Sequence, residues 1–351
     1  MTGVPTTQHP ELGFYTLAGA PRSPRDLIDE VRTAEAMGLG AAFISERFNI
    51  KEASTLSGAA GAVSEHLRII TGATNHNTRH PIVTAAYATT MHFLTGGRFT
   101  LGIGRGIAPL QDAFGMGRIT TAQMEDFAGL MRRLWRGETV VGHDGPAGSW
   151  PVLRLDPDFD EEIPLGLTAF GQNSLSLGGR AFDDVILHTF FTDETLTRCV
   201  DTVKRAAERA GRDPASVRVW SCLATIGDHI DEPLRLKKTV GRLATYLQAY
   251  GDLMVETNRW DPAVLTRFRE DPFVAGFRGA LDATATTAEL EHVATLLPDE
   301  WLAPSATGTA ERCATAVRRQ LELGADGVIM HGATPTELAP ILDAYALDAT
   351  R

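Results

Sequence analysis

The chain has few cysteines, and their spacing excludes two kinds of cysteine chemistry. Among 351 residues there are three, Cys199, Cys222 and Cys313, an odd number with no CxxC spacing. A disulfide framework uses an even set and a zinc knuckle uses closely spaced pairs, so neither is expected. We interpret the three thiols as small core residues.

Long apolar runs and an excess of positive charge are also missing. No run reaches the length of a membrane span, and the first residues, MTGVPTTQHP, have neither the basic start nor the apolar centre of a signal peptide. We therefore expect a soluble, cytoplasmic protein with no membrane partner. The formal net charge of −11 argues against a nucleic acid partner, because nucleic-acid-binding proteins normally carry basic stripes.

Lysine is scarce, since only four of the 33 basic residues are lysine. Schiff-base catalysis needs a lysine buried at the end of a strand, where loss of hydration lowers its pKa. Lys51 comes closest to such a place, but the EASTL that follows it predicts a helix start, and we expect its side chain to be solvated. Covalent lysine chemistry is therefore not favoured.

Short apolar runs alternate with amphipathic stretches along the chain, a pattern typical of βα units repeated around a parallel sheet. Eight such units favour a (β/α)8 TIM barrel of the α/β class, built as a single domain over 1–351. A doubly wound sheet usually has fewer strands and a GxGxxG turn after the first, whereas LAGAPRS follows the first strand here. The predicted strands are 12–18, 41–48, 67–73, 98–104, 163–170, 184–190, 217–227 and 326–332.

Two stretches interrupt this regular alternation. Residues 139–162 are rich in Gly, Pro and Asp, which predicts an inserted hairpin or loop after the fourth helix. Residues 231–298 form a mainly helical insertion that is well beyond ordinary loop length. Because the site of a barrel enzyme is built from the loops at the carboxyl ends of its strands, an insertion after the seventh strand is expected to cover the mouth.

Two histidines follow the third strand, and their spacing raises the question of a metal site. His76 and His80 are four residues apart, which suits a shared metal ion only on a helix. Pro81 is favoured at a first helical position, so both histidines are expected to lie in the extended loop before that helix. We predict no metal, with His76 as a polar group at the mouth and His80 as a helix-start residue.

The fifth predicted strand leads into AFGQNSLSLGG, which is a candidate phosphate site. A glycine and small polar residues open a helix there, and free backbone N–H groups at a helix start attract anions. The alternative is an ordinary helix cap made by the side chain of Asn173 or Ser174. The sequence leaves both interpretations open.

Four segments together resemble the luciferase-like monooxygenase superfamily, and within it the branch that uses the deazaflavin coenzyme F420. The most specific is LRIITGATNHNTRHPIVTAAYATTMHFLTGGRFTLGIGRG, which joins a TGxT…RHP strand, a helix ending in LTGGR and a GIGRG strand. The others are LGFYTLAG, AEAMGLGAAFISERFN and ELGADGVIMHGATPTELAPILDAY, so the resemblance covers nearly the whole chain.

The resemblance implies a role for the end of the third strand. In this superfamily that strand ends in a bulge, often with a cis peptide that is not before proline, which presses on the middle ring of the flavin or deazaflavin. In this sequence the bond is Gly72–Ala73, with Asn75 and His76 edging the cofactor pocket. The other positions that the resemblance assigns to cofactor binding are Tyr15, Arg47, Gly104, Arg105, Gly106, Phe170, Gly171, Gln172 and Asn173.

The chain also departs from the superfamily at positions that carry chemistry. Relatives often have an acidic residue and a histidine where Glu46 and Arg47 stand, and an arginine suits an anion clamp better than a proton carrier. Sugar-phosphate dehydrogenase relatives have a glutamate where Ile107 stands, so that reaction is not expected.

The function implied by the resemblance is hydride transfer between C5 of F420 and a small organic substrate, with Glu46, His76 and His331 as the available proton handlers. The alternative is an FMN-dependent monooxygenase, and a second alternative is a barrel that binds F420 without catalysis. Arg47, Arg79 and Arg105 are candidates for the acidic tail of F420, or else residues of surface ion pairs. Superfamily members commonly dimerise, so we expect a homodimer.

Overall fold

Eight parallel strands form a closed barrel in the computed structural model, which describes residues 8–19, 21–48, 50–156 and 158–348. Neighbouring strands follow the order β9, β11, β1, β2, β3, β4, β7 and β8, and the pairing of β8 with β9 closes the ring. The predicted (β/α)8 barrel is therefore confirmed. The strands are β1 His9–Tyr15, β2 Leu39–Ile44, β3 Arg68–Thr71, β4 Phe99–Ile103, β7 Leu165–Thr168, β8 Asp184–Ile186, β9 Arg218–Gly227 and β11 Gly327–His331.

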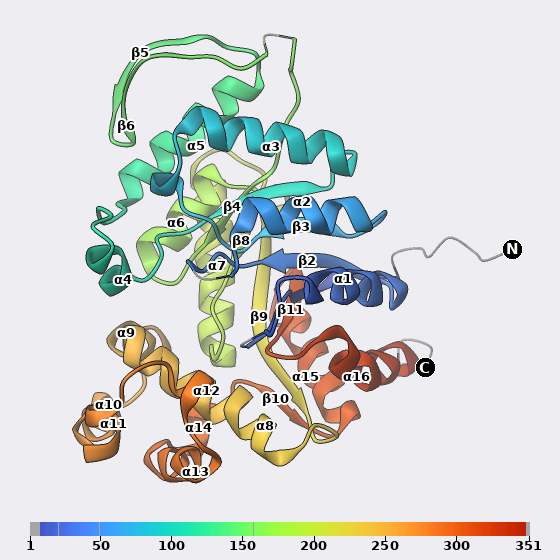
Figure 1. The fold of residues 1–351 in the computed structure, drawn as a ribbon, viewed down its shortest axis with the longest axis vertical. Helices are drawn as coiled ribbons and strands as arrows, with labels where there is room; N and C mark the ends of the chain where they lie inside the picture. The colour runs from blue at the N-terminus through green and yellow to red at the C-terminus, as the bar shows by residue number, and fades with distance from the viewer. Residues whose placement is uncertain (1–7, 20, 49, 157, 349–351) are drawn as a thin grey trace, which may run out of the picture.

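Helices surround this barrel and alternate with its strands along the chain (Figure 1). The helix predicted to start at Pro81 does so, with His80 as its N-cap and Gly96 in the left-handed conformation at its end. The helices of the ring are α1 Asp26–Ala36, α2 Ala53–Val63, α3 Pro81–Thr95, α4 Ala108–Ala113, α5 Thr121–Trp135, α6 Gln172–Ala181, α7 Asp193–Arg209, α15 Ala310–Glu322 and α16 Pro335–Asp348, with short 3-10 turns η1 His76–Thr78 and η2 Pro214–Ser216.

The first interruption of the alternation contains an antiparallel hairpin, β5 Val140–Gly145 and β6 Gly148–Leu153. It lies at one end of the molecule beside α3 and α5 (Figure 1). The carboxylate of Asp126 on α5 accepts from the Ala147 backbone N–H at 2.9 Å and contacts His143 Nε2 at 3.0 Å. The hairpin is thereby fixed to the helix that precedes it.

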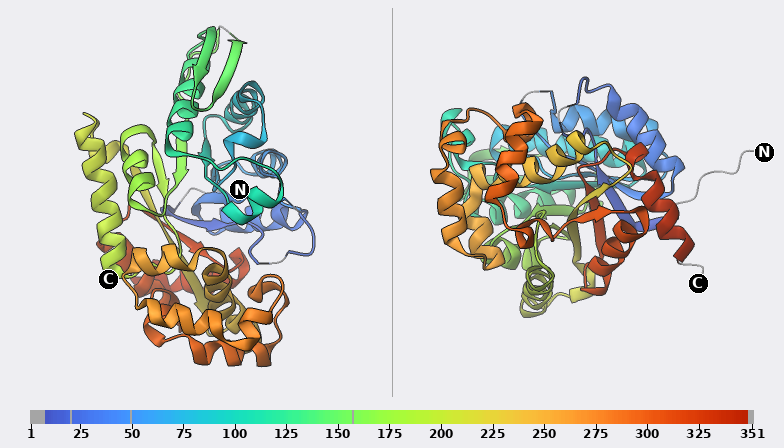
Figure 2. Two further views of the ribbon diagram at one scale, coloured as in Figure 1. Left: turned by 90° about the vertical axis from the view of Figure 1, so that its left-hand side faces the viewer. Right: turned by 90° about the horizontal axis from the view of Figure 1, so that it is seen from below.

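The second interruption is a group of helices with an apolar core of its own, in which Trp260 and Trp301 stack with ring centroids 4.5 Å apart. Figure 2 shows these helices, in orange, at the opposite end of the molecule from the hairpin. The chain then passes through β10 Ala306–Gly308, which pairs with β9. The segments are α8 Glu232–Leu236, the π-helical turn η3 Lys237–Gly241, α9 Arg242–Asn258, α10 Pro262–Glu270, α11 Pro272–Gly276, α12 Leu281–Thr284, α13 Thr287–Leu296 and α14 Asp299–Leu302.

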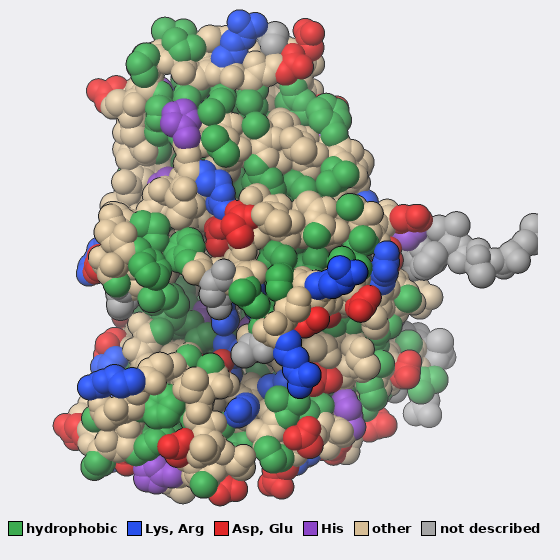
Figure 3. Space-filling model, in the orientation of Figure 1, with side chains coloured by type: hydrophobic (Ala, Val, Ile, Leu, Met, Phe, Trp, Pro, Cys, Tyr) green, Lys and Arg blue, Asp and Glu red, His purple; other side chains and the backbone are tan. Residues whose placement is uncertain are grey.

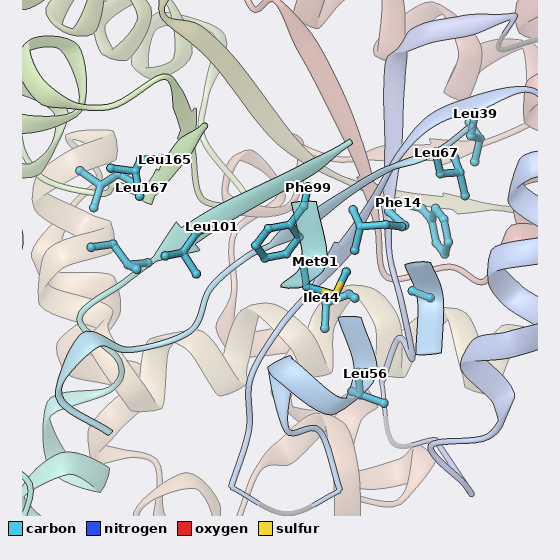
Figure 4. Packing of buried hydrophobic residues seen from close by; sticks show 14 of the residues in the cluster. Phe14, Leu39, Ile44, Leu56, Leu67, Met91, Phe99, Leu101, Leu165 and Leu167 are labelled. Carbon is cyan, nitrogen blue, oxygen red and sulfur yellow. The ribbon is translucent and has the colours of Figure 1, made fainter. Parts of the chain in front are cut away.

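Apolar side chains fill both sides of the barrel wall. Figure 4 shows Phe14, Ile44, Phe99 and Leu101 packed between the strands and the helices that cover them. Inside the barrel, Phe43 and Trp220 meet edge to face with ring centroids 5.0 Å apart. No helix among the described residues is long and apolar enough to cross a membrane.

The glycines of strand β4 are explained by the neighbouring strands. A Cβ on Gly102 would lie 1.8 Å from the carbonyl oxygen of Thr71, and one on Gly104 would lie 2.3 Å from Thr168 Oγ1. Thr71 on β3 also donates to the Gly102 carbonyl at 2.8 Å and accepts from its N–H at 2.7 Å. These two glycines of the GIGRG run therefore allow β3, β4 and β7 to approach closely.

Candidate active site

The carboxyl ends of the strands open toward α4 and α9, and we call this end of the barrel the mouth. The face is hollowed between the upper body and the lower group of helices, with histidine and basic side chains in the hollow (Figure 3). Two strand-end residues meet there, since the rings of Tyr15 and His331 are 5.3 Å apart in an edge-to-face contact. Tyr15 and His331, which the sequence places at the ends of the first and eighth strands, therefore lie next to one another.

An aromatic cluster from α9 completes this side of the mouth. His188, just after β8, contacts Tyr250 Oη through its Nε2 at 2.8 Å and lies with its ring 4.6 Å from that of Tyr246. Phe170 packs against His188 at 4.7 Å between ring centroids. The backbone of Tyr250 departs from helical geometry, with φ −156° and ψ 39°, where α9 bends. The sequence did not single out Tyr246 or Tyr250, because helical periodicity alone does not reveal which strand ends an insertion covers.

Both imidazoles of the mouth are held uncharged at neutral pH. Burial lowers the pKa of His188 to about 4. Burial also places the pKa of His331 well below its usual value, and the nearby charges of Arg242, His188, Arg47 and Lys51 act in the same direction. Among the described residues, His331 Nδ1 is buried with no hydrogen-bond partner. His331 therefore presents a free polar atom rather than a positive charge.

The expectation of a solvated Lys51 is wrong, because its side chain is only 3% exposed. The Arg47 N–H donates to the Lys51 carbonyl at 2.9 Å, so the loop after β2 folds back and carries Lys51 under the loop after β1. Its Nζ donates to the carbonyl oxygen of Leu17. Burial, with Arg47 and Arg242 nearby, lowers the pKa of Lys51 to about 7. Covalent lysine chemistry can therefore no longer be disfavoured on the ground that Lys51 is solvated.

Glu46 occupies a buried ion pair instead of a free position in the mouth. Its side chain is 3% exposed, and Arg79 Nη2 donates to its Oε1 at 2.6 Å. Thr74 Oγ1 donates to the other carboxylate oxygen, and Arg79 also pairs with Glu52 on the surface side. A carboxylate bonded in this way is a poor proton carrier, so the geometry disfavours the predicted role of Glu46. Arg79 is an ion-pair residue, as one of the two sequence interpretations proposed, but only its pair with Glu52 is at the surface and its pair with Glu46 is buried.

Asn75 and His76 point away from one another at the end of β3. Asn75 is buried, and its Nδ2 donates to the Gly104 carbonyl at 2.7 Å, which joins β3 to β4. The ring of His76 packs 5.3 Å from that of Phe127 on α5, and burial lowers its pKa. His76 thus faces the helix layer, and this position disfavours it as a proton handler.

The bond between Gly72 and Ala73 is a cis peptide that does not precede proline. A Cβ on Gly72 would lie 2.9 Å from Tyr15 Oη, so the end of β3 lies against the tyrosine of the mouth. Gly106 has φ +72°, which favours glycine, and a Cβ there would meet Gln111 at 2.4 Å. Arg105 is exposed and donates to Thr121 Oγ1 at the start of α5.

The N-terminus of α6 has no side-chain cap. Gly171 is the N-cap residue and accepts the Leu175 N–H at 3.0 Å. Ser174 Oγ donates to the Gly171 carbonyl at 2.9 Å and accepts from the Phe170 N–H at 3.4 Å, which precedes the helix. No side chain of the described residues accepts from an N–H of the first turn, so the capping alternative for Asn173 or Ser174 is wrong. Within the described part of the chain, the N–H groups of Gln172, Asn173 and Ser174 have no acceptor, which suits a bound phosphate.

Phe170 links that helix start to the mouth, because its ring contacts both His188 and Tyr250. Around the mouth and elsewhere in the described ranges, no three His, Cys, Asp or Glu side chains gather as they would around a metal ion. The donor set is thus backbone N–H groups, cations and neutral rings, which fits an anionic cofactor with a flat ring system.

Comparison with known proteins relates the chain to oxidoreductases. A phthiodiolone/phenolphthiodiolone dimycocerosates ketoreductase from Mycobacterium sp. (strain JLS) is 28% identical over 244 residues, which cover 66% of this chain. The matched part spans 61% of the length of that ketoreductase.

Three solved structures share the fold at low sequence identity. The coenzyme F420-dependent tetrahydromethanopterin reductase from Methanopyrus kandleri has a TM-score of 0.79 at 16% identity, with 96% of this chain and 99% of that chain covered. An F420-dependent secondary alcohol dehydrogenase, in complex with an F420–acetone adduct, has a TM-score of 0.68 at 16% identity and coverages of 95% and 97%. The oxygenating constituent of 3,6-diketocamphane monooxygenase from Pseudomonas putida, in complex with FMN, has a TM-score of 0.63 at 18% identity and coverages of 96% and 96%.

The family model for luciferase-like monooxygenases matches residues 4–327. That match includes all the strand-end residues described above except His331, and it agrees with the closed barrel and its insertions. The chain therefore belongs to the luciferase-like monooxygenase family.

Proposed function

We propose that this protein is an F420-dependent oxidoreductase that transfers a hydride between the deazaflavin and a small organic substrate. The observation that carries the proposal is the uncapped N-terminus of α6, which opens beside the aromatic wall of the mouth. Phosphate groups bind at such helix starts because unpaired N–H groups and the helix dipole favour negative charge there.

The named relatives support a reductase or dehydrogenase. A ketoreductase is among the curated relatives, and two of the neighbours in fold are F420-dependent enzymes. When bound, the deazaflavin would supply or accept the hydride at its C5 atom. The contribution of the chain is to bind this group, exclude water and manage one proton.

Tyr15 and His331 are the residues that we assign to the proton. Burial, with Cys222 and Tyr246 nearby, raises the pKa of Tyr15 well above its usual value, so its hydroxyl keeps its proton and can donate a hydrogen bond to a substrate oxygen. His331 lies beside it as a neutral imidazole with an unpaired Nδ1. The pair therefore offers one donor and one acceptor to a carbonyl or alcohol group.

An FMN-dependent monooxygenase is the second candidate, and the shared fold with the FMN-bound oxygenating constituent favours it. The two functions differ in reductant and in their use of oxygen. Anaerobic mixing of the protein with reduced F420 and a panel of ketones, aldehydes and activated alkenes separates them. We expect a substrate-dependent return of the visible absorbance of the oxidised deazaflavin.

Oxygen consumption with reduced FMN, together with no reaction of F420, would instead establish the oxygenase. Binding of F420 without turnover of any substrate would support the alternative of a barrel that binds F420 without catalysis. A His331→Gln variant should lower kcat by about 10²-fold or more, the usual contribution of a positioned proton carrier, while the Kd for F420 changes little. An unchanged kcat would remove His331 from the reaction.

A further inference from the structure

The mouth carries positive charge that the described side chains do not neutralise. Arg47 is exposed at the end of β2, and its side chain has no hydrogen-bond or ion-pair partner in the described part of the chain. Among the described residues, the Nζ of buried Lys51 has one hydrogen bond, to the neutral carbonyl of Leu17. Both lie close enough to His331 to lower its pKa.

The neighbouring carboxylates are already engaged. Glu46 is paired with Arg79, and Asp282 is paired with Arg242 at 2.7 Å in a contact where both side chains are about nine-tenths buried. Lys238 holds Glu337 of α16 at 2.6 Å.

Within the part of the chain that the structure describes, Glu30 of α1 is the remaining acid that acts on Lys51. It accepts the Leu17 N–H at 2.6 Å, and burial raises its pKa to about 6. Its attraction is the smallest of the effects on the pKa of Lys51, below the repulsion from Arg47 and Arg242. Glu30 therefore compensates the lysine only in part.

Uncompensated cations at this place contrast with the acidic character of the whole chain, whose formal net charge is −11. Burial and the neighbouring Arg47 disfavour the charged form of Lys51, whose pKa is about 7, and a negative group bound beside the two side chains would stabilise that form. Such groups are typical of binding sites, where a ligand supplies the missing charge.

We propose that Arg47 and Lys51 form an anion subsite that receives a carboxylate or phosphate group of the substrate. This inference rests on the proposed function, because it names the class of substrate for the same mouth. Arg47 contacts the anion directly, and Lys51 adds its charge from beneath. The loop after β2 is three strand positions around the barrel from β7, which leads into α6. A phosphate of the cofactor at α6 and the anion of the substrate are therefore held by different elements.

Nuclear magnetic resonance of the lysine side chains tests this subsite without cofactor or turnover. The chain has only four lysines, so ¹³C-lysine labelling gives few signals, and Lys51→Met assigns one of them. Inorganic phosphate, acetate and benzoate are titrated in turn at constant ionic strength against chloride. We expect at least one of them to raise the apparent pKa of Lys51 above its unliganded value, with saturation. An unchanged Lys51 titration with all three would overturn the proposal.

Two charge variants identify the source of the anion. Arg47→Gln should lower the affinity for the anion that shifts the Lys51 signal by about tenfold or more, as loss of a charged hydrogen-bond donor does. It should leave the Kd for F420 within about threefold of its unaltered value. Lys204→Met is the matched control, because Lys204 pairs with Asp326 before β11 at the opposite end of the barrel, and it should change neither affinity.

If Arg47→Gln weakens F420 binding about tenfold or more, the subsite holds the acidic tail of the cofactor and the assignment to substrate is wrong. If F420 fails to bind the unaltered protein while the anions still shift the Lys51 signal, the proposed function fails and the subsite stands. Lys51→Arg keeps the charge and should retain anion affinity even if Lys51→Met unfolds.

Discussion

The charge state of each ionisable side chain at the mouth depends on its burial and on its neighbours. Glu46 and Arg79 are bonded to one another, so the two strand-end loops after β2 and β3 are held together by a buried pair. Lys51, His188 and His331 are buried beside cations, which favours their neutral forms. The local charge of the site is thus set by contacts rather than by residue type alone.

Arg79→Met should leave the buried Glu46 carboxylate without its partner. The loss of one member of a buried ion pair costs about 3 to 5 kcal/mol of unfolding free energy. The double variant Glu46→Leu with Arg79→Met should recover much of this loss, because no charge is then left unpaired. Urea denaturation of the two single variants and the double variant gives the coupling, and strict additivity would show that the pair is not linked.

Lys51 should make stability depend on pH above neutrality. Its pKa is about 7 in the folded chain against an ordinary value of 10.5, so the unfolded chain binds the extra proton between these two pH values. The contribution of this group to stability is therefore lowest below pH 7 and rises with pH up to about 10.5, by at most about 1.4 kcal/mol per pH unit. Urea unfolding of the unaltered protein and Lys51→Met at pH 7 and pH 9 measures the difference; parallel pH profiles would contradict the assignment.

At the scale of elements, close packing of three strands shapes the end of the barrel. Gly102 lies so near Thr71 that any side chain would push β3 from β4. The start of α6 is also unusual, because a helix start usually has a side-chain acceptor for its free N–H groups and this one has none.

Gly102→Ala should destabilise the chain by about 1 to 3 kcal/mol or more, the range for overpacked core positions, because its Cβ would lie 1.8 Å from a carbonyl oxygen. Gly58→Ala on α2 is the matched control, since nothing lies within 4 Å of its Cβ position and alanine favours a helix by about 1 kcal/mol. Thermal unfolding should therefore move in opposite directions for the two variants. Equal unfolding midpoints for the two variants would contradict this, and would show that β3 and β4 can move apart without loss of stability.

Gly171→Asp should separate helix stability from cofactor affinity. Its φ of −94° suits any residue, and the nearest atom to a new Cβ is 3.8 Å away on Leu253, so a side chain fits. Aspartate at an N-cap favours the helix by a few tenths of a kcal/mol, yet its charge repels a phosphate. We expect a slightly higher Tm with F420 affinity at least about tenfold lower, whereas the neutral Gly171→Asn should lose much less. Equal affinities for both variants would place the phosphate elsewhere.

At the scale of the whole molecule, the alternation of apolar runs was enough to predict the barrel. Every predicted strand overlaps an observed one, because buried parallel strands leave short apolar runs that survive in any single sequence. The site was harder to predict. The burial of Lys51 depends on a backbone pairing inside a loop. The insertion was expected over the mouth, but no local pattern shows that Arg242, Tyr246 and Tyr250 are the residues of α9 that face it.

The most direct test of the account is the affinity of the purified, cofactor-free protein for F420 and for FMN, titrated in parallel by fluorescence at the same salt concentration. The account predicts that F420 binds at least about tenfold more tightly than FMN and that Gly171→Asp weakens the F420 complex. Tighter binding of FMN than of F420 would contradict it and assign the barrel to flavin chemistry with oxygen.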